Sequence, residues 1–387
     1  MTDVVIPRSG MTDERRQRLT SALVYIGLVA AAILSALALA ALILALADRP
    51  AGEAFELLAR GSVGSTAAIV TSLNHTAPIL VVAIGACIAG RAGLMNIGQE
   101  GQVLLGATFG VVVGTTLSGP SWMMVPIVLA GAALGGAAWA GIAAVLRYVS
   151  NVNEVVSTLL LNLLAVAFVS YLVNQPSLLQ ENIPQGSIQA ASPQTDAIDR
   201  AAQLPALLSG RGYRLHAGVL IGVVLAVVVA FLLARSRWGF RLRMFGHNPR
   251  AARRAGVRPI VMGASALVLS GAFAGLAGGI VLSGTAMRVT PAVAGNFGWE
   301  GLLVALVARY NAVTAIVVAF LFGALRAGGG SLAASGVDSS IVGVIQALIV
   351  LAVMLPALYM QRRRSRRASE IARRASAPAP VPSLETV

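Results

Sequence analysis

The chain of 387 residues is too apolar for a soluble globular protein, because 57% of its residues are hydrophobic, only 11% are charged, and its mean hydropathy is +0.81. Apolar runs of about 20 residues, the length with which a helix crosses roughly 30 Å of hydrocarbon, recur along it. The alternating polarity typical of transmembrane β-strands is absent from the sequence. We therefore predict an all-α, polytopic integral membrane protein with about ten transmembrane or half-membrane helices.

Residues 20–360 are predicted to form the transmembrane domain, preceded by a cytoplasmic N-terminal segment, residues 1–19. The first apolar segment has a core about twice as long as that of a signal peptide, so we expect it to anchor the chain. The eighth segment is too short to span a bilayer, which indicates a half-helix buried among the others. The ten predicted segments are residues 20–47, 64–89, 94–117, 122–146, 155–174, 215–234, 260–283, 299–308, 312–330 and 340–359.

The distribution of arginine predicts the orientation in the membrane. Of the formal charge of +14, residues 1–19 contribute +1, residues 235–258 contribute +8 and residues 361–387 contribute +5. Basic segments remain in the cytoplasm. Both termini and the loop 235–259 are therefore expected to be cytoplasmic, and residues 175–214 extracytoplasmic, in a multi-pass protein of the cell (inner or plasma) membrane.

The same basic segments suggest lipid headgroups as partners. A charge surplus that follows membrane topology gives no reason to expect nucleic-acid binding. The C-terminal segment, residues 361–387, is both basic and Pro-rich. We expect this tail to be disordered.

The motif Asn-x-Gly-x-Glu-Gly occurs twice, at residues 96–101 and 296–301. In the predicted topology the two copies run in opposite directions, as in inverted-topology repeats, which place a substrate path at their interface. A carboxylate near hydrocarbon is costly and therefore indicates function. The candidate residues for the path or its gate are Asn96, Gln99, Glu100, Asn162, Asn296, Trp299 and Glu300.

The two copies are expected to lie at different depths. Asn96, Gln99 and Glu100 are predicted to share one helix face near the bilayer midplane, since separations of three and four residues coincide on a helix. The copy that contains Asn296 and Glu300 is expected nearer the outer surface. The alternative to a path is that these side chains only stabilise helix packing through interhelical hydrogen bonds.

Glycines spaced four residues apart predict close helix packing. They form two ridges, one at Gly106, Gly110 and Gly114 and the other at Gly271, Gly275 and Gly279. Small residues in such a ridge let a second helix approach closely.

The loop 235–259 contains signals for one short helix. Asn248 can cap it, Pro249 suits its first position and Gly256 can end it. Its small residues Ala251 and Ala252 would fit a groove of another protein. The alternative is an ordered loop without a partner.

Neither ATP hydrolysis nor metal chemistry is predicted for this chain. It contains no Lys, so a GxxxxGK[ST] phosphate loop is impossible. Cys87 is the only Cys, and the three His are far apart in sequence, which leaves no metal-ligand or nucleophile signature. We predict no catalytic residue, no metal and no cofactor, and any ATP must be hydrolysed by another subunit.

Four segments carry a resemblance to a known family. The chain resembles permease subunits of bacterial ABC importers in the branched-chain amino acid/ribose-type permease family, and within it is most similar to nucleoside and simple-sugar permeases. The resemblance extends over about residues 64–356. The segments are residues 91–102, 153–162, 298–301 and 322–326.

This resemblance implies a nucleoside importer, with a simple sugar such as a pentose as the alternative substrate. It implies three protein partners: cytoplasmic ABC ATPase subunits, a second permease subunit, homologous or identical, and an extracytoplasmic substrate-binding lipoprotein. The residues that match the family's ATPase-coupling segment are Gly246, Asn248, Ala251, Ala252 and Gly256. An ion-coupled secondary transporter would also use inverted repeats, but it would not need the capped helix.

Overall fold

The structure is a computed structural model that describes residues 50–182, 192–334 and 343–348, single residues between 31 and 45, and residues 350 and 369. The chain divides into two compact units. Nearly all described residues belong to the unit Gly52–Val342. The predicted first and last spans, the N-terminal segment and the basic tail lie wholly or mostly outside the described residues.

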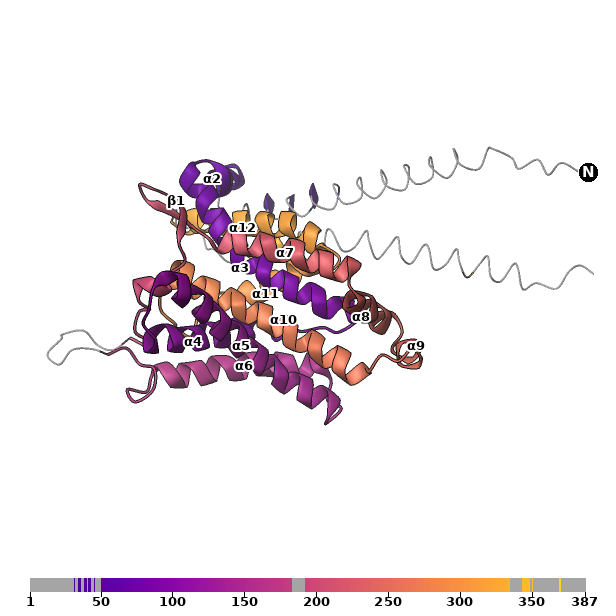
Figure 1. Ribbon diagram of the computed structural model, residues 1–387. Coiled ribbons are helices and arrows are strands. Elements are labelled where there is room, and N and C mark those ends of the chain that lie inside the picture. The colour runs from indigo at the N-terminus through magenta and orange to yellow at the C-terminus, as the bar shows by residue number, and fades with distance from the viewer. Residues whose placement is uncertain are drawn as a thin grey trace, which may run out of the picture. The chain divides into compact units, whose positions relative to one another are not determined.

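The described chain is almost entirely helical (Figure 1). Its elements are α2 (Ala51–Val63), α3 (Thr66–Arg91), α4 (Gln99–Thr116), α5 (Ser121–Tyr148), α6 (Glu154–Val173), η1 (Arg200–Ala202), β1 (Ala206–Gly210), β2 (Tyr213–His216), α7 (Gly218–Arg235), α8 (Arg237–His247), α9 (Pro249–Arg254), α10 (Pro259–Val281), η2 (Leu282–Ala286), α11 (Phe297–Val307) and α12 (Ala312–Ala334).

Six of the described helices are long and apolar enough to cross a membrane: α3, α5, α6, α7, α10 extended through η2, and α12. The prediction of a helical polytopic membrane protein is thereby confirmed. The predicted short eighth segment is also confirmed, as the eleven-residue apolar helix α11.

Three features differ from the sequence prediction. Helix α4 begins at Gln99 rather than near residue 94, because Gly93 takes a left-handed conformation (φ +71°) and residues 94–98 are not helical. Helix α8 was expected to be loop, since its arginines make it polar. The segment between α6 and α7 contains an antiparallel hairpin, β1–β2, whose turn has Gly212 at φ +80°, so the all-α prediction missed two short strands.

Helices α4, α5 and α10 pack backbone to backbone. A Cβ atom at Gly106 would lie 2.3 Å from the Cα of Gly275, and one at Gly271 would lie 2.6 Å from the carbonyl oxygen of Gly136. Real Cβ atoms do not approach so closely, so these positions admit only glycine at the present helix spacing. The predicted close packing is confirmed at Gly106, Gly271 and Gly275, whereas a Cβ atom at Gly110 or Gly114 would meet only side chains.

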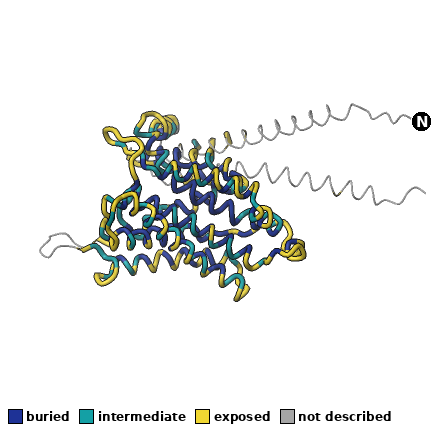
Figure 2. Tube along the Cα trace, viewed as in Figure 1, coloured by how far each residue is buried: buried dark blue, intermediate teal, exposed yellow. Residues whose placement is uncertain are grey.

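Helices α6 and α7 lie at the periphery, where Figure 2 shows many exposed residues. Their exposed side chains are apolar, as expected of a surface that faces lipid tails. On α6 they include Leu159, Leu163 and Phe168, and on α7 they include Val224 and Phe231.

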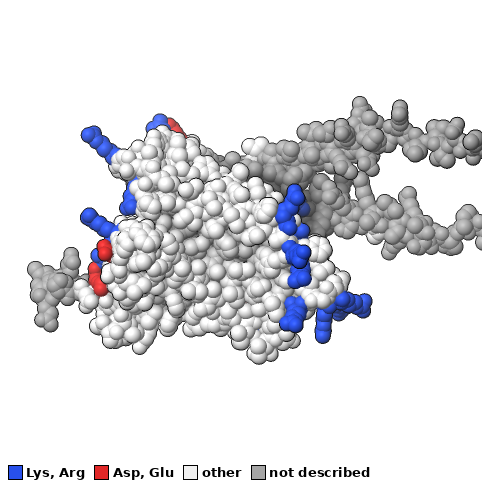
Figure 3. Space-filling view, viewed as in Figure 1, with Lys and Arg blue, Asp and Glu red and all other residues white. Residues whose placement is uncertain are grey.

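Charged side chains gather at the two ends of this unit. Figure 3 shows arginines at both ends, including where α8 and α9 lie, and acidic residues only towards the hairpin, with a band between the ends that is free of charge on the visible face. An uncharged band between polar ends is the surface expected of a protein that crosses a bilayer.

Candidate functional site

The two copies of the duplicated motif meet in the structure. The Oε1 atom of Glu100 accepts the backbone N–H of Asn296, and its Oε2 atom accepts that of Gly298, both at 2.8 Å. Asn296 is the N-cap residue of α11, and its own side chain makes no capping bond. The Glu100 carboxylate therefore satisfies two backbone donors at the start of α11 and sets a negative charge at the positive end of that helix.

The contact is close enough to exclude any side chain from Gly298. A Cβ atom there would lie 2.3 Å from the backbone nitrogen of Glu100. Asn296 has a left-handed backbone (φ +69°), which turns the chain into the helix beside the carboxylate. The glycine and the carboxylate of the motif thus serve one interaction between its two copies.

Two expectations for these copies are wrong. The second copy does not lie nearer the outer surface than the first, because Asn296 and Gly298 bind Glu100 directly. Asn96 does not share a helix face with Gln99 and Glu100, because it lies three residues before the start of α4. The second error arose because residues 94–98, which were expected to be helical, are not.

Buried amide side chains hold the break between α3 and α4. Asn96 and Gln102 exchange two hydrogen bonds, of 2.8 and 3.1 Å. Asn162 of α6 accepts the backbone N–H of Gly101 at 2.8 Å and donates to the carbonyl oxygen of Ile97 at 2.9 Å. These bonds favour the packing role for Asn96 and Asn162, whereas a role in the path stays a prediction.

Gln99 is only partly satisfied by its surroundings. Its Nε2 atom donates to the carbonyl oxygen of Val82 at 3.2 Å and to the Ser270 hydroxyl at 3.3 Å. Within the described chain its buried Oε1 atom has no hydrogen-bond partner. A buried acceptor without a donor is costly, which makes Gln99 the residue of this group that is least explained by packing.

Glu300 forms an ion pair with Arg326 of α12, at 2.7 Å between Oε1 and Nη1. The guanidinium carbon of Arg326 also lies 4.2 Å from the centre of the Phe297 ring. Arg326 was not among the predicted site residues. A lone arginine within an apolar span was the signal for it, because such a charge is costly and is retained with a partner. Trp299, by contrast, is 37% exposed.

A cavity of about 210 Å³ lies next to Arg326. Residues from α3, β2, α10, η2, the segment before α11, and α12 line it. Its polar and aromatic lining residues are Asn74, His75, His216, Phe297 and Arg326, of which Phe297 lies within the second copy of the motif. In the described chain, no three His, Cys, Asp or Glu residues are grouped to hold a metal ion.

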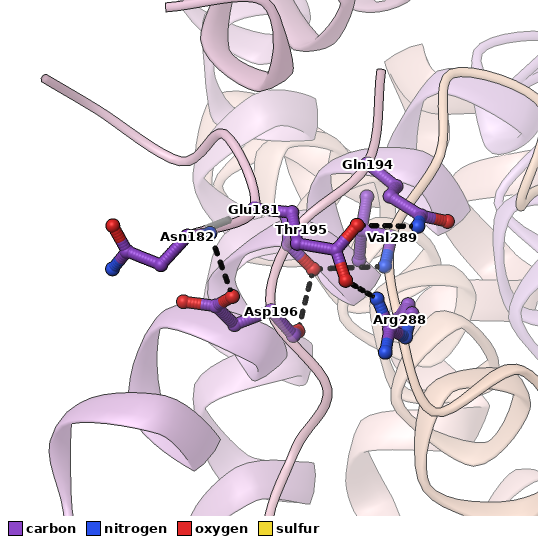
Figure 4. Close-up of polar contacts among 7 residues, drawn as sticks. All are labelled: Glu181, Asn182, Gln194, Thr195, Asp196, Arg288 and Val289. Carbon is purple, nitrogen blue, oxygen red and sulfur yellow. Dashed lines mark hydrogen bonds and ion pairs between the residues drawn. The ribbon is translucent and has the colours of Figure 1, made fainter. Parts of the chain in front are cut away.

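The segment between α6 and α7 contacts the chain that follows η2 (Figure 4). Arg288 pairs with the Glu181 carboxylate, which also accepts a hydrogen bond from Gln194 at 2.6 Å. Thr195 and Val289 exchange hydrogen bonds of 3.0 and 3.1 Å. The hydrogen bond from Gln194, and then Arg288, hold the pKa of Glu181 below its ordinary value. The segment 288–296 that leads into α11 is therefore tied to the segment between α6 and α7.

The short helix predicted after residue 248 is confirmed as α9. The Asn248 side chain accepts the backbone N–H of Ala251 at 3.0 Å, and Gly256 follows the helix at φ +80°. Ala251 is exposed, whereas Ala252 is fully buried. Of the two alanines, only Ala251 thus offers its side chain to a partner.

Gly246 fixes α8 and α9 against the end of α3. A Cβ atom at Gly246 would lie 2.3 Å from the carbonyl oxygen of Arg91. The Arg91 side chain in turn donates to the carbonyl oxygen of Tyr310, between α11 and α12, at 2.9 Å. The surface that carries Ala251 is therefore connected to the ends of α3 and α11.

Comparison with known proteins places this geometry in a family. Residues 68–358 match the family model described as the branched-chain amino acid transport system permease component. A glucose ABC transporter permease protein of Haloferax volcanii is 32% identical over 340 residues, which cover 86% of this chain and 87% of that protein. A guanosine ABC transporter permease protein of Bacillus subtilis is 32% identical over 329 residues, covering 83% and 91%.

A third relative, a nucleoside ABC transporter permease protein of Lactococcus lactis, is 27% identical over 304 residues, covering 76% of this chain and 81% of its own. No solved structure matches the chain. The matched region contains the six described spanning helices except for the first two residues of α3, and it contains both copies of the motif and α9. The chain therefore belongs to this family of ABC transporter permease components, in which the permease is not an enzyme and a separate ATPase subunit hydrolyses ATP.

Proposed function

We propose that this chain is a permease subunit of an ATP-driven importer for nucleosides. The choice of a nucleoside as substrate rests on two similarities. One is to the guanosine permease, 91% of whose length is covered, and the other is to the nucleoside permease of Lactococcus lactis. A simple sugar is the second candidate, because the glucose permease of Haloferax volcanii is equally identical, at 32%.

The two motif copies belong, in this proposal, to two halves of inverted topology. The contact between Glu100 and the start of α11 supports this reading, since it joins the two copies directly. Half-helices that begin inside the membrane are typical of transport pathways. The path then runs beside the starts of α4 and α11, with Gln99, Glu100 and Glu300 as the nearest titratable or amide groups.

The end of the unit that carries α8 and α9 is the cytoplasmic end in this proposal, and both termini lie on that side. There α9 contacts the ATPase through Ala251, held by Asn248, Gly246 and Gly256. Residues 175–214 face outward and receive a substrate-binding lipoprotein. The exposed position of Ala251 and the direct packing of α8 on α3 support this arrangement.

A second permease subunit completes the transporter. Two different guanosine permease proteins of the same Bacillus subtilis strain match this chain, one at 32% and the other at 24% identity. This pair supports a partner that resembles the present chain without being identical to it.

Uptake by the reconstituted transporter tests the proposal. The permease, a second permease, the ATPase and the binding protein are placed in vesicles, and uptake of labelled guanosine and labelled glucose is measured with and without ATP while ion gradients are abolished. ATP-dependent guanosine uptake supports the nucleoside proposal. Uptake of glucose alone selects the sugar, and uptake driven only by an imposed ion gradient refutes ATP coupling.

A further inference from the structure

The cavity beside Arg326 lies at the end of the unit that carries the hairpin. His216, the last residue of β2, forms one wall, and Phe297, the first residue of α11, forms another. Asn74 of α3 fixes the hairpin wall, since it donates to the carbonyl oxygen of Arg214 at 2.8 Å and accepts the backbone N–H of His216 at 3.3 Å. The cavity is thus built from segments that are more than 200 residues apart in sequence.

The charges around the cavity do not favour an ionic ligand. Arg326 is the cationic lining residue, and its Nη1 atom is engaged by Glu300. His216 is 1% exposed, and its Nδ1 atom accepts the backbone N–H of Gly218 at 3.1 Å, which requires that nitrogen to be unprotonated. Burial, with a smaller effect of Arg214, lowers the pKa of His216 to about 4, so the ring is neutral at physiological pH.

The remaining groups suit a neutral ring with hydrogen-bonding substituents. The Phe297 ring lies against the His75 ring, with 6.1 Å between centres, and against Arg326 at 4.2 Å. Such a cluster offers flat surfaces for a planar or cyclic ligand. Since Nδ1 of His216 is an acceptor, its Nε2 carries the proton and is a donor, and Arg326 keeps further N–H groups beside those used by Glu300.

The size of the cavity limits what can enter it. Pockets that enclose a drug-sized ligand have volumes of about 300–1,000 Å³. The present cavity, at about 210 Å³, is smaller. It accommodates one ring of a solute rather than a whole nucleoside.

We propose that this cavity is a solute-binding site, and that it holds the base or sugar ring of the uncharged molecule that the transporter imports. The inference rests on the proposed function and adds a set of contact residues to it: Phe297 and His75 stack on the ring, and His216 and Arg326 donate to its oxygen or nitrogen acceptors. None of these four residues lies in the first motif copy. The solute therefore contacts α11 on its Phe297 side, while Glu100 holds the start of the same helix.

A cysteine-labelling experiment tests the site. Cys87 is the only cysteine and is buried, so the Cys87→Ala chain is a suitable background. Thr285→Cys places a thiol at an exposed residue of the cavity lining, and Ser209→Cys, on the exposed strand β1, is the matched control outside the cavity. Both are treated with a small charged methanethiosulfonate reagent in the assembled transporter, with guanosine, glucose or inorganic phosphate present.

The expected result has two parts. Guanosine or glucose slows labelling of the Thr285→Cys variant at least tenfold but leaves the Ser209→Cys variant unchanged, and phosphate protects neither. Labelling of the Thr285→Cys variant then lowers its uptake at least tenfold relative to the same variant before labelling.

Other outcomes overturn the inference in distinguishable ways. If the parent imports guanosine or glucose but neither solute protects the Thr285→Cys variant, the cavity is not the binding site although the proposed function stands. Labelling of the Ser209→Cys variant alone means that the cavity is closed to water. Protection by phosphate refutes an uncharged ligand. If the parent imports neither solute, the proposed function fails and the inference fails with it.

Discussion

The substitution Glu100→Gln tests whether the carboxylate holds the start of α11. The side chain keeps its length, but one of its two oxygens becomes an NH2 group. The carboxylate now accepts two backbone N–H groups, at 2.8 Å each. In the variant one of these backbone N–H groups faces the new NH2 group, which is also a donor, and the other N–H group donates to a neutral amide oxygen instead of a charged one.

The expected change in the free energy of unfolding follows from the loss of one hydrogen bond and of the negative charge. A hydrogen bond to a charged group contributes about 1.5–3 kcal/mol, and a buried donor without a partner adds to its loss. Removing a negative charge from a helix N-terminus costs about 0.3–2 kcal/mol more. We therefore expect Glu100→Gln to lower the free energy of unfolding by roughly 2–5 kcal/mol.

The assay is thermal unfolding of the purified permease in detergent, with Glu56→Gln as the control. Glu56 makes an exposed ion pair with Arg60, four residues later on α2, which is worth at most about 0.5 kcal/mol. We expect Glu100→Gln to lower the midpoint by about 5 °C or more and the control to leave it in place. Equal midpoints for the two variants would show that Glu100 does not stabilise α11.

Three further predictions concern other parts of the molecule. Gly298→Ala is expected to lower the unfolding midpoint, at a cost of about 1–3 kcal/mol for forced backbone movement, whereas Gly141→Ala, whose Cβ would meet nothing within 4 Å, is expected to be neutral; similar midpoints would contradict the close contact. Ala251→Glu should leave the midpoint unchanged and reduce ATP-driven uptake at least tenfold, and normal uptake would reject α9 as the ATPase contact. Because Gln194 and Arg288 lower the pKa of Glu181, its contact with them is complete at neutral pH and is lost as the pH falls through that lowered pKa. Protection of the amides of residues 192–198, measured relative to the intrinsic exchange rate at each pH, should then fall, and Arg288→Ala should lower it already at pH 7. Exchange that is the same in both proteins at every pH would rule out the contact.

The sequence predicted α9 almost completely because its signals are local. Asn248, Pro249 and Gly256 act on the backbone within a few residues, so their spacing defines a helix without knowledge of the rest of the chain. The glycine ridges and the short helix α11 could be predicted for a similar reason. Their patterns lie within single segments.

The contacts of Glu100 and Glu300 could not be derived in this way. Glu100 binds backbone groups 196 and 198 residues further along the chain, and no spacing rule identifies an acceptor for a distant helix start. The prediction that Asn96 shares a helix face with Gln99 and Glu100 also failed, because a helix break between Gly93 and Gly98 moved Asn96 out of α4. The family resemblance pointed to both motif copies, but only tertiary structure shows that they touch.

The backbone contacts between α4, α5 and α10 have a consequence for the permeability of the membrane to protons and small ions. At Gly106, Gly136, Gly271 and Gly275 the helices approach within less than the width of a side chain. No chain of water molecules fits along such a seam, so protons and small ions find no passage there. A transporter works across a membrane that holds a potential, and this glycine seam keeps that potential from leaking through the centre of the protein while solute moves elsewhere.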